Sequence, residues 1–204
     1  MPTTTNNGWP TPADTDLVKN GADAIRDLGQ AIDTTLGVYS SSTPGLVKIN
    51  TTTFSGVSSV SLPNDTFTST HKNYRIILNV ETLSTTLDIT SRFRTAGSNN
   101  TTANYNYFLY TANSSASTDV LTSARSATSA TIKSAGVTSQ YFVLDVMNPQ
   151  ATFITSVTGQ GNELLANLLT FGFGFGLTTS FDSMSFIAST GTISGVVSCY
   201  GYQS

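Results

Sequence analysis

The residue types that most often carry out chemistry in proteins are scarce in this chain. His71 is the only histidine and Cys199 the only cysteine. A histidine-dependent catalytic triad would need His71, and no serine lies in a nucleophile-elbow motif. A lone cysteine excludes an intrachain disulfide and a cysteine-rich metal site. The sequence therefore predicts no catalytic residue, no metal site and no cofactor, and we expect His71 to be a surface side chain.

Carboxylates are sparse as well, and their spacing does not indicate a catalytic pair of the kind that glycoside hydrolysis requires. The acidic residues expected in strands or turns are Glu81, Asp88, Asp145, Glu163 and Asp182. Motifs for phosphate, dinucleotide or calcium binding do not occur. We therefore expect no enzyme, and a glycan depolymerase is the one enzymatic alternative.

Aromatic side chains offer a different chemistry, because a tyrosine ring can stack against a sugar. The tyrosines considered for this role are Tyr105, Tyr107, Tyr110, Tyr141, Tyr200 and Tyr202. Side chains alternate between the two faces of a strand. We therefore expect at least half of these tyrosines to be core residues.

The composition predicts a β protein without a charged target. Only 10% of the 204 residues are charged and the net charge is −3. About three residues in ten are Ser or Thr, well above average usage, which suits the outward faces of strands. The chain has neither a basic run for nucleic acid nor an apolar run long enough to span a membrane. We expect no nucleic-acid partner, no membrane insertion and no secretory signal.

Residues 14–37 are the only segment predicted to form a long helix. A capping box ending at Asp14 begins it, and Gly37 is expected to end it. Apolar residues then recur at alternating steps of three and four, as in a heptad seam. The residues predicted to hold an oligomer together along this seam are Val18, Gly21, Ile25, Leu28 and Ile32. The alternative is that the helix packs on the chain's own β-domain.

Residues 1–13 are predicted to form an extended arm, because their prolines disfavour helix. Trp9 is expected either to anchor the arm in a partner protein or to fold back on the helix. The candidate anchoring residues are Trp9, Pro10 and Pro12.

After a linker at 38–45, residues 46–204 are predicted to form an antiparallel β-sandwich of the jelly-roll type. The expected strands are 46–50, 56–61, 74–82, 87–95, 104–112, 127–133, 140–147, 151–158, 164–175, 183–189 and 192–202. The run ELLANLL at 163–169 is interpreted as strand, with a helical turn as the alternative. The chain as a whole is thus expected to be mainly β, with an arm and a single amphipathic helix in front.

The run FGFGFG at 171–176 places three phenylalanines on one face of a strand and three glycines on the other. A bare glycine face often marks the close approach of another backbone. Gly172, Gly174 and Gly176 are therefore candidate contacts with a neighbouring subunit. The alternative is a packed phenylalanine face backed by an uncrowded solvent face.

The amino-terminal sequence TTTNNGWPTPADTDLVKNGADAIRDLGQAIDTTLG resembles the leader of small structural proteins of tailed bacteriophages, of the tail-fibre and minor-tail type. NYRIILN (73–79), TSRFRTAG (90–97), NYNYFLY (104–110), VLDVMNP (143–149) and the segment 177–202 resemble the β-sandwich tips of the same group. The resemblance covers most of the chain and contains no catalytic motif.

This resemblance implies a homotrimeric virion protein, assembled in the host bacterial cytoplasm. Such a protein attaches to other virion proteins through its amino-terminal segment, contains a coiled coil, and meets the host surface through its β-domain. A host cell-surface glycan is then the candidate ligand. The chain lacks the long shaft of a reaching fibre, which leaves a capsid decoration or cement protein as the alternative.

Overall fold

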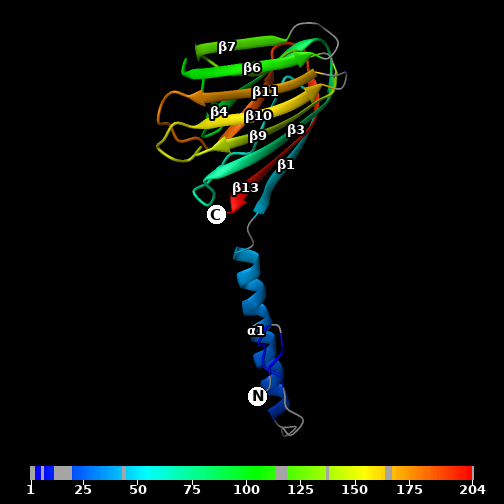
Figure 1. Ribbon diagram of the computed structural model, residues 1–204, viewed down its shortest axis with the longest axis vertical. Helices are drawn as coiled ribbons and strands as arrows, with labels where there is room; N and C mark the ends of the chain where they lie inside the picture. Colours follow the sequence, from blue (N-terminus) through cyan, green and yellow to red (C-terminus); the bar gives the residue numbers. More distant parts are fainter. Residues whose placement is uncertain are drawn as a thin grey trace. The chain divides into compact units, whose positions relative to one another are not determined.

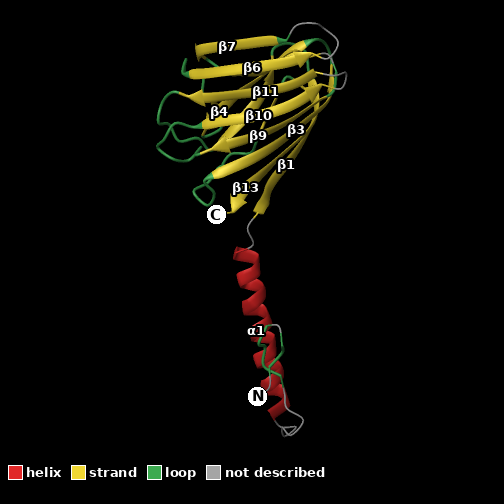
Figure 2. Ribbon diagram, in the orientation of Figure 1, coloured by secondary structure: helices red, strands yellow, loops and turns green. Residues whose placement is uncertain are grey.

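The computed structural model describes residues 3–5, 7–11, 20–42, 45–113, 119–136, 138–163 and 167–203. The chain divides into two compact units, and the second begins at Gly45, next to the domain start predicted at residue 46. The first unit contains the helix α1 (Gly21–Ser42) and the second contains the β-strands, as Figures 1 and 2 show. The chain is mainly β, as the sequence predicted.

The helix α1 continues to Ser42, so the end predicted at Gly37 is wrong. A helix-ending glycine adopts a left-handed conformation, and Gly37 does not have a positive φ. Glycine inside a helix lowers helix stability by about 1 kcal/mol relative to alanine. The helical turns before and after Gly37 offset this cost. The predicted start near Asp14 lies outside the described residues. Within those residues, the helix is not long and apolar enough to cross a membrane.

The described part of the segment expected as an extended arm turns back on itself. The Thr4 N–H donates to the Trp9 carbonyl at 2.8 Å, and the Gly8 N–H donates to the Thr4 carbonyl at 3.0 Å. Thr3 and Pro10 form an isolated antiparallel bridge. Gly8 has a φ of 63°, a conformation that glycine adopts without steric cost. The turn is therefore encoded by the glycine that precedes Trp9.

The second unit consists of two antiparallel sheets. The eight-stranded sheet has the order β1-β13-β3-β9-β10-β11-β6-β7, which can be followed in Figure 1. Its strands are β1 (Gly45–Val57), β13 (Ile193–Gln203), β3 (Asn73–Leu83), β9 (Gln140–Met147), β10 (Ser156–Glu163), β11 (Asn167–Phe175), β6 (Tyr105–Asn113) and β7 (Val120–Ala127). The five-stranded sheet contains β2 (Ser59–Ser61), β12 (Ser183–Ala188), β4 (Leu87–Thr95), β5 (Ser98–Asn99) and β8 (Ala130–Gly136). The sandwich predicted from the sequence is confirmed.

The two sheets enclose a single apolar core, and strand alternation decides which residues enter it. In β3 the buried residues are Tyr74, Ile76, Leu78 and Val80, all fully shielded from solvent. The FGFGFG run follows the same rule, because Phe171, Phe173 and Phe175 are all buried. The predicted phenylalanine face is therefore a core face.

Several strands differ from the sequence-based expectation. β1 continues through residues 51–55, which were expected to separate two strands, β5 was not predicted, and β8 spans Ala130–Gly136 instead of 127–133. β7 was not predicted, because its sequence VLTSARSA is exposed at most positions and lacks an apolar alternation; pairing with β6 makes it a strand. β10 begins at Ser156, so the strand predicted at 151–158 is wrong over its first five residues. Phe153 and Ile154 lie in a loop there and are exposed. Residues 163 and 167–169 of the ambiguous ELLANLL run are in strands, and 164–166 lie outside the described residues.

Candidate functional site: the outer face of the eight-stranded sheet

The single histidine is packed against the end of β13. An added Cβ on Gly201 would lie 2.4 Å from the His71 ring, so the ring covers this glycine. His71 Nδ1 lies 3.1 Å from the Tyr202 carbonyl oxygen, and the ring meets Tyr74 edge-on at 5.9 Å. These contacts leave His71 half-buried, at the edge of a shallow surface depression that Lys72 and Gln150 also line. Its contacts position the β13 terminus.

The carboxylates considered for catalysis lie on different elements. Asp88 accepts a hydrogen bond from the Ala135 N–H at 2.7 Å, and Asp182 accepts one from the Ala96 N–H at 2.5 Å. Glu81 is exposed at the end of β3. Among the described residues, no three His, Cys, Asp or Glu side chains are placed to hold a metal ion together.

A buried ion pair that no sequence pattern predicted joins the two sheets at one end of the sandwich. Lys133 Nζ of β8 lies 3.3 Å from Glu163 Oε2 of β10, with both side chains at most 4% exposed. Asn167 donates to the same Glu163 oxygen at 2.8 Å. Gln140 lies opposite Glu163 in the neighbouring strand and is fully buried. No sequence signal marks these residues, because each is a single polar residue near a strand end.

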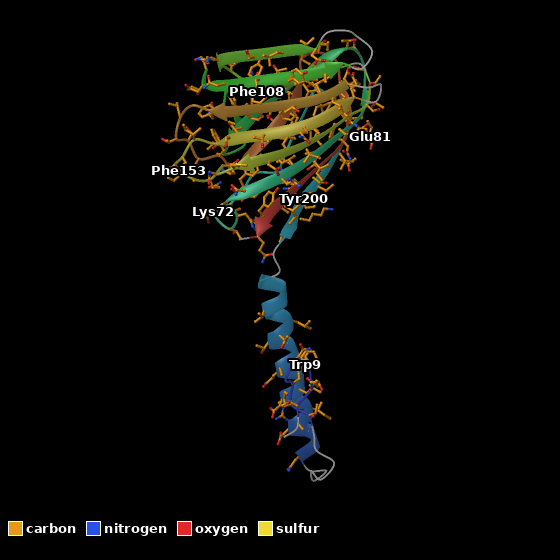
Figure 3. The ribbon with its side chains drawn as sticks, viewed as in Figure 1. Trp9, Lys72, Glu81, Phe108, Phe153 and Tyr200 are labelled. Carbon is orange, nitrogen blue, oxygen red and sulfur yellow. The ribbon has the colours of Figure 1, made fainter. Side chains whose placement is uncertain are left out.

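The side of the eight-stranded sheet that faces away from the core carries a wide aromatic and aliphatic surface. We call this surface the outer face. Its exposed apolar and aromatic side chains include Leu46, Phe108, Tyr110, Leu121, Tyr141, Val143, Met147 and Leu168. Figure 3 labels Phe108 on β6, the strand next to the edge strand β7. Exposed apolar patches of this kind mark interaction sites in soluble proteins.

The tyrosines divide differently from the sequence-based expectation. Tyr105 is buried, accepts a hydrogen bond from the Phe93 N–H at 2.9 Å and has a pKa raised by burial to about 12. Tyr107 packs against the core from the same strand. The four on the outer face are Tyr110, Tyr141, Tyr200 and Tyr202. The expectation that at least half of the six are core residues is therefore wrong, because the register of β13 and β9 turns three of them outward.

A charged cluster occupies the outer face where β3, β9 and β13 run side by side. Arg75 donates from Nε and Nη2 to the two carboxylate oxygens of Asp145, at 2.8 and 2.7 Å. The Tyr202 hydroxyl donates to Asp145 at 2.7 Å, and the Arg75 guanidinium lies 5.7 Å from the centre of the Tyr202 ring. The bonds from Arg75 hold the pKa of Asp145 below its ordinary value. Burial, followed by the bond to Asp145, raises the pKa of Tyr202. The cluster is therefore a satisfied ion pair at neutral pH.

Phe108 divides the outer face into two depressions. It lies directly opposite Gly172 in the register of β6 and β11, and an added Cβ at Gly172 would lie 2.7 Å from its ring. The first depression, of about 480 Å³, has Gly172 and Gly174 at its floor and Arg125 on its wall. The second, of about 360 Å³, lies beside Phe108 over β9 and β10 and includes the Arg75 cluster. Glycine at position 172 is what lets the ring lie across the strand.

The candidate subunit contacts Gly172 and Gly174 both lie on the outer face of β11, while Gly176 follows the end of the strand. The Phe108 ring of the same chain fills the space above Gly172. An added Cβ at Gly174, in contrast, meets only ordinary contacts at 3.6 Å or more. Contact of these glycines with a neighbouring subunit stays a prediction.

The residues predicted to act in oligomerisation and anchoring lie in the first unit. Ile25 is 68% exposed, Leu28 and Ile32 are half-buried, and Val18 lies outside the described residues. The Trp9 indole N–H donates to the Thr35 hydroxyl at 3.0 Å. Trp9 was expected either to anchor in a partner protein or to fold back on the helix, and this contact corresponds to the fold-back.

Gly21 is half-exposed at the first turn of α1. Pro10 is half-buried and takes part in the bridge with Thr3. Pro12 lies outside the described residues.

No protein-family model, no curated protein and no solved structure matches this chain.

Proposed function

We propose that this protein is a non-enzymatic structural protein of a bacteriophage virion. It binds a glycan of the host cell surface through the outer face of its eight-stranded sheet. The observation that carries the proposal is the position of Phe108 over Gly172, with a depression on each side. The sequence resemblance to tail-fibre and minor tail proteins supports the virion assignment.

The chemistry of the outer face suits a sugar better than a purely apolar partner. Sugar rings present C–H groups that pack on the electron-rich face of an aromatic ring. Phe108 is 45% exposed, and Tyr141 is exposed to a similar degree. Hydroxyl and amide groups line the two depressions beside Phe108, from Thr158 and Gln160 of β10 and from Asn106 of β6. Aromatic faces beside fixed hydrogen-bonding groups are the usual composition of a small-molecule site.

The first unit supports the assembly part of the proposal. A lone helix of 22 residues is marginal in water, and α1 exposes Ile25 and Leu36 at 68% and 60%. These side chains lose their contact with water if α1 helices of three chains associate as a coiled coil. The trimer then joins the remaining virion proteins through its amino-terminal segment.

A binding assay with two exposed phenylalanines tests the glycan proposal. Phe108 lies on the outer face, whereas Phe153 lies in the loop before β10 and is 68% exposed (Figure 3). We expect the full-length protein to bind members of an array of bacterial surface polysaccharides. Phe108→Ser is expected to abolish this binding and Phe153→Ser to preserve it. Equal loss in both variants, or no binding by the wild type, would contradict the proposal.

The enzymatic alternative is tested in the same material. Release of new reducing ends from a bound polysaccharide would identify a depolymerase in place of a binding protein. For assembly, sedimentation equilibrium at micromolar concentration is expected to give the mass of three chains. Ile25→Asp is expected to reduce that mass to one chain, and a monomeric wild type would refute the trimer.

A capsid decoration protein is the second candidate. It is favoured by the aliphatic residues Val120, Leu121 and Leu168, which are 54% to 67% exposed around β7 and β11 and suit a protein surface better than a sugar. Immunogold labelling of intact particles separates the two functions. We expect label at the tail, and label over the whole shell would establish the decoration role instead.

A further inference from the structure

The first depression on the outer face has the dimensions of a single sugar ring. Ser156, Gly174 and Asn106 lie side by side in one row across β10, β11 and β6, and Thr158, Gly172 and Phe108 form the next row. Strands lie about 4.8 Å apart and alternate residues about 6.8 Å apart along a strand. The two rows therefore cover an area of roughly 10 by 7 Å, enough for one pyranose. The volume of the first depression, about 480 Å³, lies within the range of small-molecule sites.

The Phe108 ring covers Gly172, and beside it the floor of this depression is formed by Gly174. A Cβ at Gly174 would lie 3.6 Å from its nearest neighbour, the Thr155 carbonyl oxygen. That distance is an ordinary contact, so packing within the chain does not require glycine here. Gly174 also has no positive φ that would require glycine. A glycine in a strand that neither packing nor backbone conformation demands fits a place where a ligand approaches closely.

The walls combine one aromatic face with polar groups. Phe108 provides the ring, while Ser156 and Thr158 of β10 provide hydroxyl groups on the opposite side. Asn106 accepts a hydrogen bond from the Ser126 N–H at 3.2 Å through Oδ1. That bond fixes the amide, so that its Nδ2 group serves as a donor.

Among the described residues, Arg125 is the only charged one that lines this depression. The described residues contain no ion pair of Arg125 within 4.0 Å. The second depression differs, since its Arg75 is already held by both oxygens of Asp145. A guanidinium group binds carboxylates by two parallel hydrogen bonds. The first depression therefore favours an anionic group at one end of a sugar, although the chain as a whole has a net charge of −3.

We propose that this depression binds an acidic pyranose, a sugar that carries a carboxylate. The sugar ring lies on Phe108 above Gly172 and Gly174, and its carboxylate binds the Arg125 guanidinium. The inference rests on the proposed function and adds to it the chemical class of the glycan and the position of the site.

Matched ligands and variants test the site by calorimetry or by ligand-observed NMR. The ligands are methyl β-glucuronide and methyl β-glucoside, which differ in the carboxylate. We expect the wild-type protein to bind the glucuronide more tightly by about tenfold or more, as for a hydrogen-bonded charge. Arg125→Gln is expected to remove that difference while keeping the weaker binding of the glucoside.

Two glycine variants locate the binding. Gly174→Val places a branched side chain on the floor and is expected to abolish binding of both ligands. Gly176→Ala is the control and is expected to leave binding unchanged, because Gly176 is exposed, lies just beyond the strand, and a methyl group there meets only ordinary contacts at 3.5 Å or more. Circular dichroism of both variants confirms that the sheet has formed. Equal binding of the two sugars, no binding of either at millimolar concentration, or unchanged binding in Gly174→Val would overturn the inference.

The polysaccharide array separates this inference from the proposed function. If the wild type binds only neutral polysaccharides, glycan recognition stands and acidic specificity is refuted. If Gly174→Val still binds acidic polysaccharides, the glycan is recognised elsewhere on the protein. If no polysaccharide is bound, both proposals fail.

Discussion

Arg75 and Asp145 face each other across two neighbouring strands, and the guanidinium engages both carboxylate oxygens at 2.8 and 2.7 Å. The pair is partly shielded, with 35% and 27% of the two side chains exposed. Tyr202 adds a third hydrogen bond from β13. One carboxylate thus links three adjacent strands at the outer face, and its ionisation affects the stability of the whole sheet.

This arrangement predicts an acid-sensitive contribution to stability. Arg75 lowers the pKa of Asp145 in the folded protein relative to its ordinary value, so the carboxylate stabilises the fold at pH values above about 5. As the pH falls through the ordinary pKa of about 4 and then through the lower folded value, this stabilisation is lost.

Asp145→Asn is expected to lower the free energy of unfolding by about 1 kcal/mol at neutral pH. The difference from wild type should shrink toward zero in acid. Urea unfolding at a series of pH values measures the difference in unfolding free energy between the two proteins. A difference that stays constant down to the lowest pH would contradict the role of this carboxylate.

Two glycines in adjacent strands are expected to respond in opposite ways to the same substitution. A Cβ at Gly159 would lie 2.3 Å from the Phe171 ring and 3.0 Å from the Val143 carbonyl oxygen. Gly159→Ala is therefore expected to destabilise the protein by about 1–3 kcal/mol, as overpacking does. Gly174→Ala has room for its methyl group and is expected to be neutral or stabilising. Thermal unfolding compares the stability of the two variants. A similar loss of stability in both would show that the space available for the methyl group does not determine the effect.

The Lys133–Glu163 pair predicts a large effect of removing one charge. Both side chains are almost fully buried, so Glu163→Gln removes the carboxylate charge that lies 3.3 Å from the lysine Nζ in a site of low polarity. We expect a loss of about 3–5 kcal/mol. Replacement of both, as in Lys133→Met with Glu163→Leu, should recover much of the loss. Glu81→Gln at an exposed acid is the control, with an expected effect of less than about 0.5 kcal/mol.

Cys199 is expected to be chemically inert in the native protein. It is fully buried on β13, and burial raises its pKa to about 12. Because the thiolate is the reactive form, both burial and pKa suppress its reactivity. A thiol reagent at mildly alkaline pH should label the native protein very slowly and the unfolded protein with one equivalent per chain. Rapid labelling under native conditions would refute the burial of this side chain.

Trp9 is the only tryptophan, so its fluorescence reports the contact with α1. Thr34 and Thr35 both donate to the carbonyl four residues earlier, at 2.8 Å, but only Thr35 also accepts from the Trp9 indole. Thr35→Val is therefore expected to shift the emission toward that of an exposed tryptophan, whereas Thr34→Val should leave it unchanged. An identical spectrum for wild type and both variants would mean that Trp9 does not rest on Thr35 in solution.

Sequence alone was sufficient to determine which side of most strands faces the core. In β3 and β11 the alternation of apolar with polar or glycine residues decides the buried face, because a strand turns every second side chain to the same side. The order of one helix followed by a β-domain also follows from local signals, namely apolar residues at helical spacing and Gly-, Asn- and Ser-rich turns, whereas the prolines of residues 1–13 did not predict that the described part of this segment turns back on itself. These features need no knowledge of distant residues.

Tertiary structure decided everything that depends on which strands become neighbours. Phe108 covers Gly172 only because β6 pairs with β11, and Lys133 meets Glu163 only because β8 lies across the core from β10. β7 is a strand through its pairing with β6, although its own sequence lacks a strand pattern. Local sequence determines the face on which a side chain lies, but contacts between residues far apart depend on the pairing and packing of the sheets. The candidate sugar site, assembled from four strands, is a property of that packing.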